Sequence, residues 1–322
     1  MKIVILDGAT TTQSDLSWQS FDRLGQVTVW PRTAPDEVKE RICEAAAVLT
    51  NKVILGESEM HAAPCLKYIG VLATGYNVVD LKAAAERGII VTNIPANSTD
   101  SVAQMAIAHL LNIANGVGQH AEAVRHGSWQ NSADFCFQLT PQMELCGKTF
   151  AVVGLGNTGL ATARLAQALG MRVVAWSSKP AKVLRGLYDI EKAESLEELF
   201  READVLSLHC PLTPPDTHHL VNARSLSWMK PTAILLNTGR GPLVDEQALA
   251  DALNAGHLYA AGVDVLEQEP PRQGSPLIGA RNCFITPHIA WATCEARQRL
   301  LETAYKNLED FLNGSPQNVV NS

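Results

Sequence analysis

The sequence predicts an α/β protein made of two doubly wound parallel-sheet domains. Its 322 residues, of which 46% are hydrophobic and 18% charged, are enough to form two hydrophobic cores. Short strand-like apolar runs alternate with helical segments through both halves of the chain. Near the middle, a glycine-rich turn is framed by a strand, a helix and a second strand.

Residues 1–98 show an α/β alternation of their own. Helical segments near residues 16–24, 35–46, 58–63 and 80–87 separate five strand-like runs at residues 2–6, 27–30, 47–50, 68–72 and 89–92. This alternation predicts a parallel sheet with right-handed crossovers, whose ligand lies beyond the carboxyl ends of the strands. The turns at residues 50–52 and 73–77 follow such ends. Gly75 in the second turn is either a simple turn glycine or a source of a backbone N–H for a carboxylate.

A long apolar segment over residues 99–114 predicts a buried helix, and we interpret His109 within it as a core histidine. The stretch that follows, over residues 121–143, is rich in aromatic and amide side chains and lacks a clear period. Long loops in compact proteins are either functional or form interfaces. We therefore interpret this stretch as a subunit-contact arm anchored by Trp129 and expect a homodimer.

The glycine-rich turn follows a buried strand expected at residues 149–153. Gly154 permits the tight turn, Gly156 lets a pyrophosphate approach the backbone, and Gly159 lets the next helix pack closely on the strand. That helix would direct its N-terminal amides at the phosphates. With a second strand at residues 172–176, the turn predicts a Rossmann domain that binds a dinucleotide.

Further strands are expected at residues 204–208, 233–236, 261–265 and 283–285. Parallel strands of one sheet present their carboxyl ends along one edge, which is also the edge of the glycine turn. Arg240, Glu269 and His288 follow the last three of these strands. We therefore expect them to converge beside the nicotinamide end of the dinucleotide.

An arginine, a carboxylate and a histidine are what hydride transfer to a 2-keto acid requires. Arg240 can hold the substrate carboxylate with a planar charged fork, and His288 can give a proton to the carbonyl oxygen. Glu269 can accept from the other ring nitrogen of His288, which fixes the tautomer of the ring. Taken singly, each residue has another interpretation. Arg240 could belong to a surface ion pair, Glu269 could be a solvated loop acid, and His288 could be a strand-end histidine whose hydrogen bonds are satisfied within the protein.

Composition argues against several other classes of protein. The 26 Lys and Arg residues against 33 Asp and Glu give a formal net charge of −7. The chain has no run of basic residues of the kind that binds nucleic acid, so nucleic acid is not an expected partner. The apolar stretch at the N-terminus is too short for a signal peptide and no later segment has the length of a membrane span, so we expect a cytoplasmic protein. The seven cysteines lack metal-ligand spacing, and no metal site is expected.

Together these motifs resemble the D-isomer-specific 2-hydroxyacid dehydrogenases along nearly the whole chain. Besides the glycine turn, the resemblance rests on the runs His209-Cys-Pro-Leu-Thr, Asn237-Thr-Gly-Arg-Gly, Gly262-Val-Asp-Val, Glu269-Pro and Thr286-Pro-His-Ile-Ala-Trp. Residues 73–80 and 101–104 resemble the glycerate dehydrogenase and hydroxypyruvate reductase branch. The resemblance implies NAD(P)-dependent reduction of a small 2-keto acid, of the hydroxypyruvate or glyoxylate type, to the D-2-hydroxy acid, and the reverse reaction.

The resemblance also implies where the functional residues lie. Arg240, Glu269 and His288 would be catalytic, and Thr74 and Gly75 would contact the substrate together with Arg240 and His288. Residues 1–98 and 289–322 would form a discontinuous, flavodoxin-like substrate domain, into which a Rossmann domain of residues 99–288 is inserted, with the active site in the cleft. The residues implied to bind the cofactor are Gly154, Leu155, Gly156, Asn157, Thr158, Gly159, Ser177, Ser178, Lys179, His209, Cys210, Pro211, Thr217, Thr238, Gly239, Arg240, Asp264 and His288.

One position departs from the NAD-preferring members of this family. Those members place an acid at the end of the second Rossmann strand, where it binds both ribose hydroxyls, whereas this chain has Ser177, followed by Ser178 and Lys179. Two hydroxyls and an ammonium group could hold a 2′-phosphate, so NADP(H) is slightly favoured over NAD(H). The alternative is a polar turn that tolerates NAD(H) through its other contacts.

Two other functions stay open from the sequence. The family includes nucleotide-sensing transcriptional corepressors of this fold, but the chain lacks the extended disordered or basic segments that recruit partners. Formate- or phosphite-oxidising relatives are the second alternative, although Glu269 beside His288 disfavours a formate-type site, which pairs its histidine with a glutamine.

Overall fold

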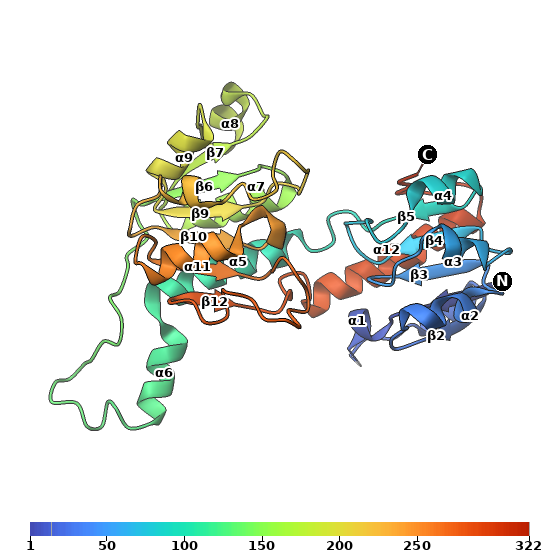
Figure 1. Ribbon diagram of the computed structural model, residues 1–322, viewed down its shortest axis with the longest axis horizontal. Coiled ribbons are helices and arrows are strands. Elements are labelled where there is room, and N and C mark those ends of the chain that lie inside the picture. The colour runs from blue at the N-terminus through green and yellow to red at the C-terminus, as the bar shows by residue number, and fades with distance from the viewer. Residues whose placement is uncertain (14, 322) are drawn as a thin grey trace. The chain divides into compact units, whose positions relative to one another are not determined.

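The computed structural model describes residues 1–13 and 15–321 and divides into two compact units (Figure 1). Unit 1 comprises residues 1–98 and 292–322, and unit 2 comprises residues 99–291. Ser322, the last residue of the predicted substrate domain, lies outside the described residues. None of the described helices is long and apolar enough to cross a membrane.

Unit 1 is built on a parallel five-stranded sheet with the order β2-β1-β3-β4-β5, which is the flavodoxin-like order. Its strands are β1 (Lys2–Ile5), β2 (Gln26–Val29), β3 (Ala47–Thr50), β4 (Tyr68–Val71) and β5 (Ile90–Thr92). The helical elements are α1 (Ala9–Thr12), η1 (Gln19–Arg23), η2 (Pro35–Glu37), α2 (Val38–Ile42), α3 (Glu57–His61), α4 (Leu81–Glu86) and α12 (Cys294–Leu312). The five strands predicted here are confirmed, each within one residue at either end.

The strands of unit 1 bury both faces, because successive side chains point to opposite sides of a sheet. Ile69 of β4 belongs to a core that includes Ile42 of α2 and Met60 of α3. Tyr68, its neighbour along the strand, packs on Phe311 of α12 with ring centroids 4.9 Å apart. The C-terminal helix therefore completes the core of unit 1, although most of the chain separates it from these strands.

Unit 2 is built on a parallel seven-stranded sheet with the order β12-β11-β10-β9-β6-β7-β8. Its strands are β6 (Thr149–Val153), β7 (Arg172–Trp176), β8 (Glu191–Lys192), β9 (Val205–Leu208), β10 (Ile234–Asn237), β11 (Ala260–Val263) and β12 (Cys283–Ile285). The helical elements are α5 (Thr99–Asn115), α6 (Val117–Arg125), α7 (Asn157–Ala168), α8 (Ala181–Tyr188), α9 (Leu196–Glu202), α10 (Ala223–Leu226), η3 (Gly241–Leu243) and α11 (Glu246–Asn254). The strand order reverses between β6 and β9, where Rossmann sheets bind their dinucleotide, and the predicted fold class is confirmed.

The sheet of unit 2 lies between two helical layers, each with its own core. Val153 of β6 packs in a cluster with Phe200 of α9 and Leu249 of α11. Val152, its neighbour along the strand, packs in a second cluster with Leu110 of α5 and Ala163 of α7. Burial on both faces explains why these strands are almost continuously apolar in the sequence.

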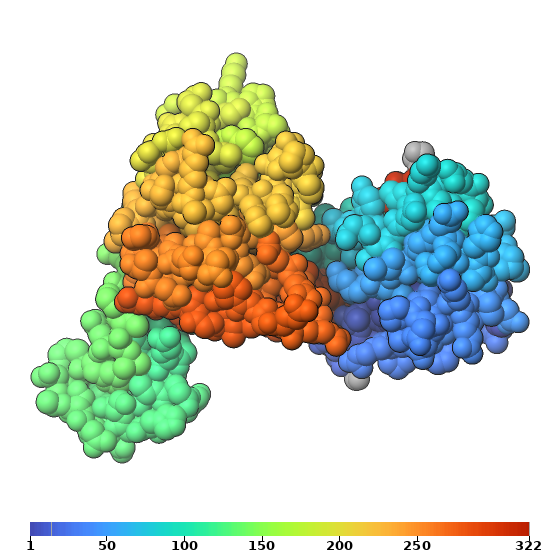
Figure 2. Space-filling model, in the orientation of Figure 1, coloured from blue at the N-terminus to red at the C-terminus, as the bar shows by residue number. Residues whose placement is uncertain are grey.

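The predicted arm of residues 121–143 begins within helix α6, which the lack of a clear period in this stretch did not indicate. Helix α6 continues to Arg125, and Glu122 pairs with Arg125 at 2.8 Å. All residues of α6 are at least partly exposed. The helix therefore has no buried apolar face, which would have shown in the sequence as apolar residues at helical spacing. Figure 2 shows the residues of this arm, coloured green, standing out from the rest of unit 2.

Candidate active site

The glycine turn joins β6 to α7, at the point where the strand order reverses. Gly154 has a φ of +90°, and a Cβ there would lie 2.7 Å from the backbone of Cys210. A Cβ on Gly159 would lie 2.1 Å from the carbonyl oxygen of Gly154, so α7 can approach the strand only because residue 159 is glycine. Gly156 faces open space, and the N-terminus of α7 has no side-chain cap. This open helix end fits a pyrophosphate group.

Two buried polar atoms of the strand-end loops have no hydrogen-bond partner within the described part of the chain. They are Nδ1 of His209, after β9, and Oγ1 of Thr238, after β10. The other ring nitrogen of His209 lies 2.8 Å from Oγ of Ser207, and burial lowers the pKa of His209 to about 4, so the ring is neutral. Buried polar atoms without partners are costly unless a ligand satisfies them. These residues therefore fit a bound dinucleotide.

Thr217 holds the loop after β9 in shape. Its hydroxyl donates to the carbonyl oxygen of Pro211 at 2.9 Å and accepts from the backbone N–H of Thr213 at 2.7 Å. Its polar contacts thus fix the loop that carries Cys210 and Pro211.

The residues predicted to select the cofactor follow β7. Oγ of Ser177 accepts from the backbone N–H of Lys179 at 3.2 Å, and Lys192 of β8 donates to the carbonyl oxygen of Lys179 at 3.1 Å. Lys192 therefore adds a second ammonium group to this turn. The sequence did not indicate it, because β8 is only two residues long and was not predicted.

Arg240, Glu269 and His288 follow β10, β11 and β12, which are neighbouring strands. Arg240 is exposed, and its Nη1 donates to the carbonyl oxygen of Gly239 at 2.9 Å. A Cβ on Gly241 would lie 1.9 Å from the carbonyl oxygen of Leu266, so the loop of Arg240 lies directly against the loop that leads to Glu269.

Glu269 and His288 are in direct contact. Nδ1 of His288 lies 2.5 Å from Oε2 of Glu269, whose Oε1 accepts from the backbone N–H of Leu266 at 2.9 Å. Because Nδ1 faces the carboxylate, Nε2 is the ring atom that can exchange a proton with a substrate. His288 has a φ of +54°, which is uncommon for a residue other than glycine, so its surroundings must hold the backbone there.

A pocket of about 500 Å³ opens beside this pair. Glu269 and His288 line it together with the apolar side chains of Ile278 and Ile285 and the thiol of Cys283. Burial, with a smaller contribution from the charge of Glu246, raises the pKa of Cys283 to about 12, so its thiol is protonated and unreactive near neutral pH. Apolar walls with a few polar groups are typical of a small-molecule site.

Thr74 and Gly75 belong to unit 1 and follow β4. Oγ1 of Thr74 donates to the carbonyl oxygen of Ile94 at 2.9 Å, and the carbonyl oxygen of Thr74 accepts from Nδ2 of Asn93 at 2.8 Å. This turn is therefore fixed at the carboxyl end of its sheet. Contact of Thr74 and Gly75 with a substrate stays a prediction.

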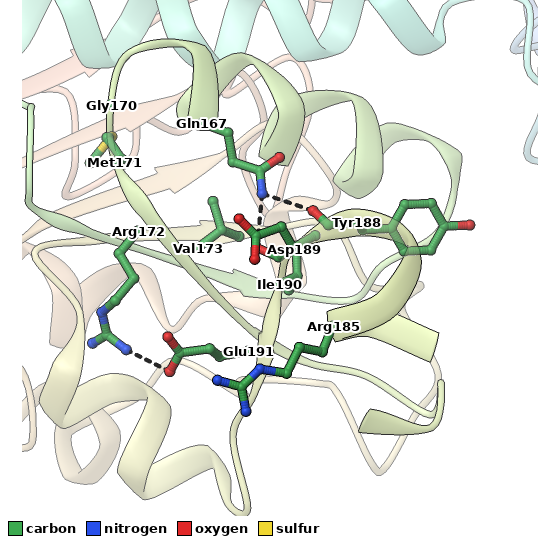
Figure 3. A pocket seen from close by; sticks show the side chains of 10 residues that line it. All are labelled: Gln167, Gly170, Met171, Arg172, Val173, Arg185, Tyr188, Asp189, Ile190 and Glu191. Carbon is green, nitrogen blue, oxygen red and sulfur yellow. Dashed lines mark hydrogen bonds and ion pairs between the residues drawn. The ribbon is translucent and has the colours of Figure 1, made fainter. Parts of the chain in front are cut away.

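A second pocket, of about 420 Å³, lies at the amino end of β7, opposite the end that carries Ser177 (Figure 3). Gln167 donates to the carbonyl oxygens of Tyr188 and Asp189 at 2.9 and 3.0 Å. Arg172, the first residue of β7, pairs with Glu191 at 2.9 Å. This pocket lies away from the carboxyl ends of the strands and its Arg172 is already paired, so we do not assign it to the active site.

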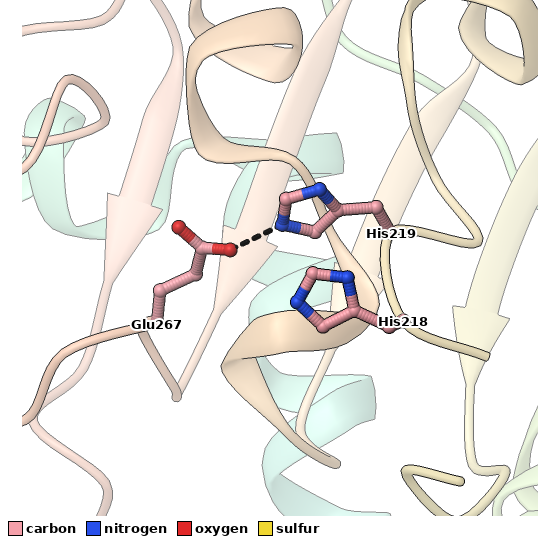
Figure 4. A group of neighbouring side chains, drawn as sticks. All are labelled: His218, His219 and Glu267. Carbon is pink, nitrogen blue, oxygen red and sulfur yellow. Dashed lines mark hydrogen bonds and ion pairs between the residues drawn. The ribbon is translucent and has the colours of Figure 1, made fainter. Parts of the chain in front are cut away.

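His218, His219 and Glu267 form a separate cluster (Figure 4). The two rings stack with centroids 4.0 Å apart, and Nε2 of His219 contacts the carboxylate of Glu267. The atoms that could bind a metal ion lie within 4.8 Å of one another. The sequence analysis considered only the spacing of the cysteines, which does not indicate this cluster. His219 already contacts Glu267, and the expected absence of a metal site stays a prediction.

Comparison with known proteins gives relatives along the whole chain. The chain is 47% identical to a hydroxypyruvate reductase of Blautia hydrogenotrophica, with 100% of both chains covered. It is 40% identical to a glycerate dehydrogenase of Methylorubrum extorquens, over 89% of this chain and 88% of that one.

The solved structures agree with these relatives. An NADPH-dependent glyoxylate/hydroxypyruvate reductase of Sinorhizobium meliloti, in complex with NADP and malonate, is 30% identical with a TM-score of 0.82, over 99% of this chain and 96% of that one. A Thermus thermophilus protein reaches a TM-score of 0.87 at 38% identity, over 99% and 100% of the two chains. The family model described as D-isomer specific 2-hydroxyacid dehydrogenase, NAD binding domain, matches residues 107–290. The chain therefore belongs to the D-isomer-specific 2-hydroxyacid dehydrogenases, the family that its motifs resemble.

Proposed function

We propose that Arg240, Glu269 and His288 carry out the reaction of this chain on hydroxypyruvate or glyoxylate. The chain is an NAD(P)-dependent oxidoreductase that reduces 2-keto acids of this type to D-2-hydroxy acids. The observation that carries the assignment of residues is the 2.5 Å contact between His288 and Glu269, beside a pocket whose lining includes Asp264 and Thr286, at the carboxyl ends of β11 and β12. It supplies an oriented proton donor where substrates of such sheets bind.

Each residue has a separate task in the reduction. Arg240 binds the carboxylate of the keto acid with two parallel N–H groups and orients the carbonyl group. The bound nicotinamide supplies the hydride. His288 donates the proton on Nε2 to the carbonyl oxygen, while Glu269 accepts the hydrogen bond of Nδ1 and stabilises the charged ring. In the oxidation of the hydroxy acid, neutral His288 takes the proton back.

We assign the binding of the substrate carboxylate partly to unit 1. Thr74 and Gly75 would contact it through their backbone groups, and the fixed turn after β4 supports this assignment. Unit 2 would be the cofactor domain, which agrees with the match of residues 107–290 to an NAD-binding domain.

We propose that the cofactor is NADP(H) in preference to NAD(H). Ser177 and Ser178 follow β7 in place of an acid, and Lys179 and Lys192 both belong to this turn through the bond at 3.1 Å. A 2′-phosphate would meet two hydroxyls and two ammonium groups here. The NADPH-dependent reductase of Sinorhizobium meliloti is a relative with this preference.

We propose a homodimer in which the arm of residues 121–143 covers the partner. Trp129 is 55% exposed and Phe135 is 90% exposed, although a hydrogen bond of 2.9 Å from Nε1 of Trp129 to the carbonyl oxygen of Phe135 joins the two residues. An ordered arm with large apolar side chains in water is costly unless another surface covers it.

Steady-state rates on glyoxylate, hydroxypyruvate, pyruvate and a bulkier 2-keto acid, each with NADH and NADPH, test the function. We expect the highest kcat/KM on one of the first two. The variant His288→Ala should lose most turnover and still bind NADPH, whereas Glu269→Gln should retain a hydrogen bond and lose part of kcat. Absence of turnover on all four substrates would favour a nucleotide-sensing protein instead.

A further inference from the structure

His109 lies on α5 in the interior of unit 2, with 5% of its surface exposed. Its imidazole packs on β11 at Gly262, where a Cβ would lie 2.7 Å from Cβ of His109 and 3.0 Å from its Nδ1. The absence of a side chain at residue 262 thus makes room for the ring. Nε2 of His109 lies 3.0 Å from Oγ1 of Thr286. His109 is buried, as a core histidine should be, but burial does not explain this bond to a loop residue.

The bond has a defined direction. Oγ1 of Thr286 donates its proton to Oδ1 of Asp264 at 2.5 Å, so Nε2 of His109 must be the donor to Thr286. Burial lowers the pKa of His109, so the ring is neutral near pH 7 and carries its single proton on Nε2. His109, Thr286 and Asp264 therefore form a chain of hydrogen bonds that ends on a carboxylate.

Asp264 uses this carboxylate to hold the loop of His288. Its Oδ1 also accepts from the backbone N–H of Ile289 at 3.0 Å, and its Oδ2 accepts from that of Ala290 at 2.8 Å. Its carbonyl oxygen accepts from the backbone N–H of His288 at 2.8 Å. Three consecutive amides thus bind one residue, at the point where His288 has its φ of +54°. A backbone in this region persists only where its surroundings fix it.

We propose that His109 is a positioning residue for His288, acting through Thr286 and Asp264 to hold the loop of residues 286–290 in the conformation that aims His288 at Glu269. This inference rests on the proposed function, because it takes His288 as the proton donor. His109 itself touches neither substrate nor the reacting atoms. Its contribution is to fix the hydroxyl of Thr286, which otherwise could turn away from Asp264.

Two pairs of variants separate positioning from packing. Thr286→Val removes the hydroxyl at nearly constant volume, and Thr286→Ser retains it. His109→Leu fills the same space without a donor, and His109→Gln retains an N–H group. We expect kcat for reduction to fall about tenfold in the Val and Leu variants, as for a lost hydrogen bond in a charged network, with recovery in the Ser and Gln variants. The dissociation constant of NADPH should change less than about twofold.

The double variant tests whether both residues act through one chain of bonds. If they do, His109→Leu combined with Thr286→Val should lower kcat no further than the worse single variant. Multiplied losses would overturn the proposal, because two residues that act separately have independent effects.

Trp291 offers a direct report on the loop that needs no substrate. Its Nε1 donates to the carbonyl oxygen of His288 at 2.9 Å. In protein labelled with 5-fluorotryptophan, the ¹⁹F resonance of Trp291, assigned with Trp291→Phe, should shift in His109→Leu and Thr286→Val and stay in place in Thr286→Ser. An unmoved resonance together with unchanged kcat in His109→Leu would overturn the proposal and return His109 to a core residue.

Failure of the proposed function has a different signature. If His288→Ala kept its turnover while the resonance of Trp291 still shifted in His109→Leu, His288 would not be the proton donor, although His109 would hold the loop. A lower melting temperature in His109→Leu with the resonance and kcat unchanged would show a purely structural role and would also contradict the proposal.

Discussion

His209 should make the stability of the cofactor-free protein depend on pH. Its side chain is buried, and burial lowers its pKa from the ordinary 6.5 to about 4. In the unfolded chain the same ring binds a proton near pH 6.5, so in the interval between these values the unfolded chain holds more protons than the folded one. The free energy of unfolding must then fall as the pH falls, beginning near pH 6.5 and ending near pH 4.

The size of the effect follows from the two pKa values. Between pH 7.5 and pH 5, proton linkage through this one residue removes about 2 kcal/mol from the free energy of unfolding. Such a change is a substantial part of the stability of an ordinary domain, which is about 5–15 kcal/mol.

Urea unfolding of the cofactor-free protein at both pH values measures this loss. Glutamine does not titrate in this range, so His209→Gln should lose about 2 kcal/mol less than the wild type between pH 7.5 and pH 5. The exposed His257 provides the control, and His257→Gln should follow the wild type. An equal loss of unfolding free energy in His209→Gln and the wild type would show that His209 is not buried and neutral. It would also remove the argument that Nδ1 of His209 binds the cofactor.

Three further predictions concern the substrate, the cofactor and the assembly. Arg240→Lys keeps the charge and loses the fork, so steady-state kinetics should show a higher KM and a kcat lower by about tenfold or more, with the affinity for NADPH retained; an unchanged kcat/KM would contradict the assignment. Lys179→Ala should weaken NADPH and leave NADH nearly untouched, and Ser177→Asp should shift the preference toward NADH; equal losses of both cofactors in Lys179→Ala, measured by fluorescence titration, would argue against a phosphate site. Light scattering at micromolar protein should give the mass of a dimer, and Trp129→Asp should lower it; a monomeric wild type would refute the role of the arm.

The sequence predicted the glycine turn and the strand-end residues because single residues decide them. A Cβ on Gly154 or Gly159 would lie only 2.7 or 2.1 Å from the backbone, so both positions require glycine. Such a requirement is visible in the sequence. Strands buried on both faces, such as Thr149–Val153, are also visible as continuous apolar runs. These features depend on the identity of one residue or of a short segment.

Features that depend on the meeting of distant segments were not predicted. Lys192 joins the turn of Lys179 only because β8 pairs with β7. His109 and Thr286 are 177 residues apart, and nothing in either segment indicates that they form a hydrogen bond. Helix α6 was missed for another reason, since a solvated helix has no apolar face to give a period.

The proposed proton donor His288 and its partner Glu269 are more exposed than the residues that hold their loop, and this difference bears on the proposed mechanism. The side chains of His288 and Glu269 are 30% and 34% exposed, which fits their proposed contact with a substrate. Asp264 and His109, which hold the loop from behind, are 1% and 5% exposed. Hydrogen bonds in the interior are stronger than those in water and cost more to leave unmade. A partly exposed histidine can therefore keep an unusual backbone conformation because its loop is anchored to a buried carboxylate, and substitutions of the buried residues should alter kcat although these residues do not contact the substrate.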